Sequence, residues 1–191
     1  VMAATQEKIF DLFIALIKKW LMDMGVNAKL FHELSGDVTL PMLARALAVG
    51  VLLYLDAPKD LIPEKLRIVG LLDDMLVMIA GLVIIVPQIP EDKLPYYRKQ
   101  YETVEKIEEY EQIVKSTLGI LWERLTQFVE KLRNRTYKNK TTEEVVLSDE
   151  LREALFDDTM IFVASLGLDP ETLDKEVNLL PSPEKVMGLL S

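Results

Sequence analysis

The sequence contains no cysteine and one histidine, His32, in 191 residues. The missing thiols exclude disulfide bonds, zinc–thiolate centres and cysteine nucleophiles, and a single imidazole cannot build a site made of several histidines. The eight glycines are scattered, and none precedes a Lys-Ser or Lys-Thr pair, so the sequence holds no glycine-rich phosphate loop of that type. Metal binding or acid–base chemistry would therefore depend on carboxylates.

The excess negative charge is confined to the end of the chain. Residues 1–142 carry 19 acidic and 19 basic side chains, whereas residues 143–191 carry 12 acidic and 3 basic ones, which accounts for the whole net charge of −9. A basic segment, residues 131–140, lies just before the acidic part and holds five cations. Such a segment is typical either of a solvated helix end or of a surface that binds phosphate or another acidic group. We expect the basic segment and the acidic region to attract each other.

Apolar residues recur at helical spacing through nearly every long segment, which predicts an all-α fold. The expected architecture is a multi-helix bundle around an apolar helical hairpin, with one long amphipathic helix and a small C-terminal helical appendage. In the first half of the chain we predict helices at 9–24, with Gly25 as a stop, within 27–39, at 41–55 and at 73–86. A long helix at 95–135 and a polar loop at 137–146 follow. The last predicted elements are a helix at 148–167 that begins at a Ser148 cap, a helix from Asp169-Pro170-Glu171, and a short piece after Pro183.

The same pattern divides the chain into two parts. Residues 1–136 form a helical body that includes the hairpin (about 42–86) and the long helix (about 95–135). Residues 137–191 form an acidic helical region, which we expect to pack on the body.

Two apolar stretches raise the question of a membrane. Residues 46–55 and 75–86 hold ten and twelve residues without a charge, whereas about 20 are needed to span a bilayer. Extending either stretch brings in Arg45, Asp56 or the Asp73-Asp74 pair, which are costly in hydrocarbon. A buried hairpin in a cytoplasmic protein is the simpler interpretation; the alternative is a hairpin that dips into a membrane or lies on its surface.

The hairpin carries a distinctive turn. An apolar helix ends in Tyr54-Leu55, a proline-bounded turn follows, and a second apolar helix comes after Gly70 and an aspartate pair. This segment resembles the YkvA-like family, a bacterial and archaeal domain of unknown function. The residues that match its pattern are Pro58, Asp60, Leu61, Ile62, Pro63, Gly70, Asp73 and Asp74. Glu64 and Asp56 depart from it, because the family usually has Asp and a small residue at those positions.

The resemblance implies an all-α module built around a helical hairpin, together with membrane association in some relatives, and it supplies no enzymatic activity. The residues themselves allow three roles for the aspartates. Asp73 or Asp74 can cap the following helix, which is the interpretation we prefer. Alternatively, Asp60, Asp73 and Asp74 converge on Mg²⁺ or Ca²⁺, since these hard cations take oxygen ligands. Crowded carboxylates can also raise one pKa enough for acid–base work.

We therefore expect a helical module that is most simply non-catalytic and acts through a protein partner or a membrane surface. The alternative is a divalent-cation-dependent protein that binds a small molecule or phosphate through the aspartate cluster. Nucleic acid is disfavoured, because a short basic run in an acidic chain is poor evidence for it. Self-association through the long helix remains open.

Overall fold

The computed structural model describes residues 2–56 and 67–177. Within these residues it contains helices, a two-stranded antiparallel hairpin and two short 3₁₀ helices. In chain order the elements are α1 (Met2–Met22), α2 (Met24–Gly36), α3 (Met42–Asp56), α4 (Arg67–Ile85), η1 (Val86–Gln88), α5 (Leu94–Gln100), α6 (Glu102–Glu105), α7 (Ile107–Leu118), α8 (Leu121–Glu130), η2 (Lys131–Asn134), β1 (Thr136–Tyr137), β2 (Lys140–Thr141), α9 (Thr142–Val146), α10 (Asp149–Ser165) and α11 (Pro170–Val177).

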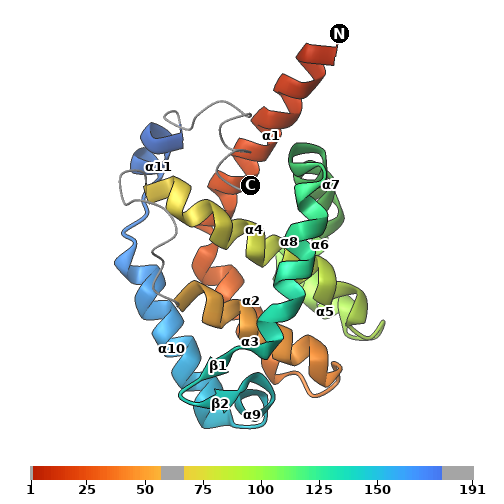
Figure 1. Cartoon of the computed structure of the whole chain (residues 1–191), viewed down its shortest axis with the longest axis vertical. Helices are drawn as coiled ribbons and strands as arrows, with labels where there is room; N and C mark the ends of the chain where they lie inside the picture. The colour runs from red at the N-terminus through yellow and green to blue at the C-terminus, as the bar shows by residue number, and fades with distance from the viewer. Residues whose placement is uncertain (1, 57–66, 178–191) are drawn as a thin grey trace.

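Helix α3 forms the centre of the bundle. Every residue from Ala44 to Leu55 is buried, because α2, α4, α8, α9, α10 and η2 all pack against this helix. Figure 1 shows these elements arranged around α3, while the N-terminal turns of α1 extend away from the body. The uninterrupted apolar run of α3 follows from this position, since a helix covered on all sides needs no polar face. The all-α class and the bundle around an apolar hairpin are thus confirmed.

The single long helix predicted for residues 95–135 is wrong. Four α-helices and η2 replace it, with breaks at Tyr101, Lys106 and Gly119. Tyr101 has extended backbone dihedrals, and Gly119 takes a φ of 55°, which favours glycine. The apolar stripe has helical spacing on both sides of each break, so periodicity alone did not reveal where the chain turns. The apolar stripe of this segment is therefore divided among several helices, and self-association through it stays a prediction.

Three boundaries also differ from the prediction. The first helix ends at Met22 and α2 already includes Gly25, so the break precedes the glycine. Helix α4 begins at Arg67 rather than Asp73. The expected loop 137–146 is a β-hairpin followed by α9, with Lys138 and Asn139 at φ values of 48° and 63° in its two-residue turn. The piece predicted after Pro183 lies outside the described residues.

The C-terminal helices pack on the other helices. Ser148 caps α10 by accepting a hydrogen bond from the amide of Leu151, as predicted. Helix α10 lies against α2 and α3, and α11 contacts α1 and α4, with an ion pair between Lys18 and Asp174. The division of the chain into a body and a separate C-terminal region stays a prediction.

One helical segment among the described residues, Leu71–Gln88, is long and apolar enough to cross a membrane by length and composition. In the structure, 72% of this segment is buried inside the bundle. Its apolar character is therefore accounted for by packing against the helices around it.

Candidate functional site

At the end of the α3–α4 hairpin, Tyr54 contacts side chains from several elements. Its hydroxyl donates a 2.7 Å hydrogen bond to Asp73 of α4, and its ring packs edge-to-face with that of Phe128 of α8 at a centroid distance of 5.7 Å. The guanidinium carbon of Arg135 lies over the same ring, 5.2 Å from its centroid. Burial, followed by the bond to Asp73, raises the pKa of Tyr54. Tyr54 thus links α3 and α4 to the chain that follows η2.

The predicted aspartate site is only partly within the described residues. Asp73 is engaged by Tyr54, Asp74 is fully buried within α4, and Asp60 lies outside the described residues. Because α4 begins six residues before Asp73, the expected capping role of the pair is wrong. Among the residues that the structure describes, no group of three His, Cys, Asp or Glu side chains is placed to hold a metal ion. A shared Mg²⁺ or Ca²⁺ site at Asp60, Asp73 and Asp74 stays a prediction.

A surface hollow of about 470 Å³ opens beside this hairpin end. Leu53 and Asp56 of α3 line one side, and residues 134–138 line the other. Burial, followed by the nearby charge of Asp158, raises the pKa of Asp56. Tyr137 donates a 2.6 Å hydrogen bond to Asp158 of α10, which ties the β-hairpin to that helix.

The cations of this hollow belong to the basic segment 131–140. Arg135 and Lys138 line it, whereas Lys140 forms a 3.3 Å ion pair with Glu144 of α9. This pair joins residues four apart in the chain, and the predicted attraction between the basic segment and the acidic region as a whole stays a prediction. The sequence identified the cations, but nothing in it indicated that η2 and β1 return to the end of α3. The hollow itself was therefore missed.

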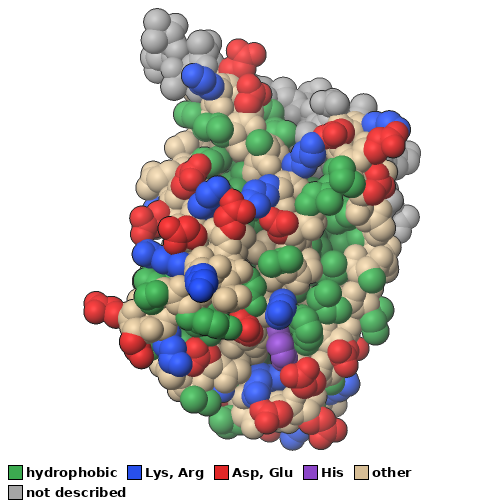
Figure 2. All heavy atoms as spheres, turned by 180° about the vertical axis from the view of Figure 1, so that it is seen from behind, with side chains coloured by type: hydrophobic (Ala, Val, Ile, Leu, Met, Phe, Trp, Pro, Cys, Tyr) green, Lys and Arg blue, Asp and Glu red, His purple; other side chains and the backbone are tan. Residues whose placement is uncertain are grey.

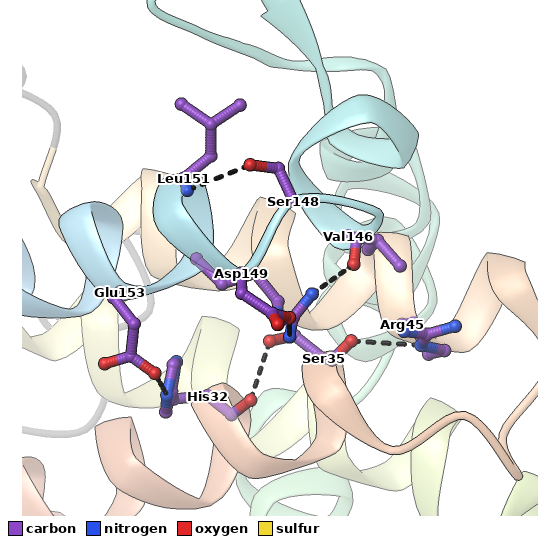
Figure 3. Close-up of polar contacts among 9 residues, drawn as sticks. His32, Ser35, Arg45, Val146, Ser148, Asp149, Leu151 and Glu153 are labelled. Atoms are coloured by element: carbon purple, nitrogen blue, oxygen red, sulfur yellow. Dashed lines mark hydrogen bonds and ion pairs between the residues drawn. The ribbon is translucent and has the colours of Figure 1, made fainter.

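A second surface of interest lies along the seam between α2 and α10. Figure 3 shows its polar end: His32 and Glu153 face each other across the two helices at 3.1 Å from Nε2 to Oε1. The imidazole also stacks on Phe156, with centroids 4.5 Å apart and planes inclined by 16°. Ser35 donates to the carbonyl of His32, and Arg45 donates to the carbonyl of Ser35 at 3.0 Å. The contacts of His32 with Glu153 and Phe156 hold α10 against α2 and make His32 a packing residue.

The other end of the seam is apolar. Met160 and Val163 of α10 pack over Gly25 of α2, where a Cβ would lie at ordinary contact distance, 3.5 Å from Met160 and 3.8 Å from Val163. Met22, the last residue of α1, and Val26 of α2 flank Gly25 in the sequence and remain 42% and 54% exposed. Figure 2 shows hydrophobic side chains gathered above and beside the single histidine on this side of the molecule. We refer to Met22, Val26, Met160 and Val163 as the seam face.

Comparison with known proteins yields one family. A model described as a protein of unknown function, DUF1232, matches residues 44–80, which include most of α3 and most of α4. No curated protein and no solved structure matched the chain. The matched residues include Leu53, Tyr54, Asp56 and Asp73, so the hairpin end and one side of the hollow lie within the family segment, whereas the seam face lies outside it.

Proposed function

We propose that the chain is a non-catalytic helical module that acts by binding a protein partner over the seam face. The observation that carries this proposal is the exposure of Met22 and Val26, which flank Gly25 in the sequence, where Met160 and Val163 of α10 pack over Gly25. Apolar side chains that cluster on a surface, as opposed to occurring singly, mark interaction sites. We also propose that residues 44–80 form a YkvA-like hairpin, which serves this module as its core.

The charge around the seam face favours one kind of occupant. Glu153, Asp157 and Met160 recur at i, i+4 and i+7, so they share one side of α10. Glu153 and Asp157 are exposed there, and Lys29 of α2 adds one positive charge. An amphipathic helix that buries an apolar stripe on the seam and places Lys or Arg beside α10 complements this surface.

The same charges disfavour a membrane surface and a second copy of the chain as occupants of the seam face. Anionic membranes attract clustered Lys and Arg, whereas the exposed part of α10 is acidic and the chain carries a net charge of −9. A second copy of the chain would bring two acidic α10 helices together, which costs repulsion. A protein partner with a basic flank is therefore the occupant that we propose.

The test uses two synthetic amphipathic helices of equal length, one of leucine and lysine and one of leucine and glutamate. We expect the full chain to bind the lysine helix in a calorimetric titration and to bind the glutamate helix at least about tenfold more weakly. Val26→Glu should weaken binding of the lysine helix on the order of tenfold, because it places a charge in the apolar contact. Val38→Glu is the matched control, since Val38 is 80% exposed in the loop after α2.

Three results would contradict the proposal. Equal effects of Val26→Glu and Val38→Glu would show that the seam face is not the contact. Flotation with anionic vesicles that Val26→Glu abolishes would replace the protein partner by a membrane surface. A concentration-dependent dimer in light scattering that Val26→Glu dissociates would replace it by a second copy.

A further inference from the structure

The hollow beside α3 lies on elements different from the seam face and has the size of a small-ligand site. Its volume of about 470 Å³ is within the range of small-molecule pockets, about 300–1,000 Å³. It is open to solvent on one side and lined by groups of both charges. The arrangement of those groups restricts the ligand that fits.

Arg135 is oriented by an aromatic ring. Its guanidinium lies over the ring of Tyr54, and Tyr54 itself contacts Asp73 and Phe128. Among the residues that the structure describes, Arg135 forms no ion pair, so its N–H donors are available. A guanidinium whose orientation is fixed loses little freedom when it binds a phosphate, and its planar fork matches two phosphate oxygens.

Lys138 supplies a second cation on the same side of the hollow. It occupies the left-handed turn of the β-hairpin, and its ammonium lies 4.9 Å from the ring centroid of Tyr137. Asp158 accepts the hydroxyl of Tyr137, so the hairpin that carries Lys138 is anchored to α10. Arg135 and Lys138 come from one short segment, and both line the hollow.

Asp56 faces these cations from the end of α3. A bare dianion in the hollow would be attracted by Arg135 and Lys138 and repelled by Asp56. A molecule with a phosphate at one end and a hydroxyl or ammonium group at the other satisfies all three side chains, because the donor group can bind the carboxylate.

We infer that the hollow binds a small phosphate ester bearing a hydroxyl or ammonium donor, with Arg135 and Lys138 on the phosphate and Asp56 on the donor. The phosphate chemistry is shared by a free metabolite and by the headgroup of a lipid. The site is independent of the seam face, since none of its lining residues belongs to α1, α2 or α10.

The experiment titrates the full chain with phosphoethanolamine, which has both groups, and with ethyl phosphate, which lacks the ammonium. We expect phosphoethanolamine to bind at least about fivefold more tightly, and Arg135→Gln to weaken it at least about tenfold, because a charge-assisted contact is lost. Lys138→Gln is a second variant at an exposed turn, and it should act in the same direction. Asp56→Asn should lower the affinity for phosphoethanolamine to that for ethyl phosphate.

Lys131→Gln is the matched control, because Lys131 belongs to the same basic segment and does not line the hollow. If Lys131→Gln weakened binding as much as Arg135→Gln, general attraction to the basic segment would explain the result and the site would be rejected. Lack of binding by phosphoethanolamine at millimolar concentration, with phosphatidylethanolamine vesicles also failing to float the chain, would reject it as well. Flotation that depends on Arg135 would identify the lipid headgroup as the source, and binding of the soluble ester alone would identify a metabolite.

Discussion

Replacing Gly50 by alanine would place a methyl group against the backbone of η2. A Cβ at this position would lie 2.4 Å from the carbonyl oxygen of Leu132 and 3.0 Å from the amide nitrogen of Arg133. Real Cβ atoms do not approach so closely, and a backbone group cannot rotate away as a side chain can. Either α3 or η2 must therefore shift.

Two opposing effects determine how much Gly50→Ala changes the free energy of unfolding. Helix propensity alone favours alanine over glycine by about 1 kcal/mol in a helix interior. Overpacking a well-packed core costs about 1–3 kcal/mol and sometimes more. Because the contact is with the backbone, we expect overpacking near the upper end of that range and a net loss of about 2 kcal/mol. A chain of this length loses about 2–4 °C in melting temperature for each kcal/mol.

The assay is thermal unfolding of Gly50→Ala followed by circular dichroism, with Gly25→Ala as the matched control. A Cβ at Gly25 meets only side chains at ordinary contact distance, 3.5 Å or more, so its substitution should leave the melting temperature unchanged or raise it. A Gly50→Ala variant that melts at or above the wild-type temperature would refute the reasoning. It would also show that the close approach of η2 to Gly50 does not set the position of residues 134–138 beside Asp56.

Three further predictions concern caps, tyrosines and metal ions. Ser148→Ala removes the side-chain cap of α10 and should lower the free energy of unfolding by about 1 kcal/mol, as measured by urea denaturation. Tyr97 donates a 2.8 Å hydrogen bond to Asp37, and burial followed by this bond raises its pKa. The neutral phenol is therefore favoured in the folded state, so its contribution is complete below about pH 10 and lost at higher pH. Tyr97→Phe should accordingly lower the free energy of unfolding at neutral pH, and its deficit relative to wild type should shrink as the pH rises above about 10; an unchanged free energy of unfolding at neutral pH would show that the bond contributes nothing. Calorimetry with Mg²⁺ and Ca²⁺ should show no binding tighter than about millimolar, because Asp74 is fully buried; tight binding abolished by Asp74→Asn would establish the aspartate site.

The sequence allowed the core to be predicted more fully than the surface. The apolar run from Ala46 to Leu55 identified α3 as a buried helix, because helix propensity and burial agree there. The breaks in residues 95–135 depend on tertiary contacts instead. Tyr101, for example, interrupts the helices with extended dihedrals and donates its hydroxyl to Glu33, 68 residues away. Local spacing carries no information about such a partner.

The candidate sites also depend on tertiary contacts that local sequence does not reveal. The basic segment was visible as charge, but its place beside α3 requires Gly50 to admit the backbone of Leu132. A helix-interior glycine is a weak signal without a structure, since it also occurs where nothing approaches. The seam face was missed for another reason: its residues come from α1, α2 and α10, and the sequence does not show that α10 packs against α2.

Adjacent acidic residues of α10 face two different surfaces, the β-hairpin beside the hollow and the solvent near the seam face. Asp158 points its carboxylate toward the β-hairpin, where Tyr137 donates to it, whereas Asp157 is exposed to solvent. Successive residues of a helix are about 100° apart, so one Asp pair serves two surfaces.

Exposed charges separated by about 10 Å are largely screened at 0.1 M salt. Added sodium chloride should therefore weaken binding of the lysine helix to wild type, and this salt dependence should fall in Asp157→Asn but stay unchanged in Asp174→Asn on α11. Equal salt dependence in all three proteins would show that the charge of α10 does not select the partner.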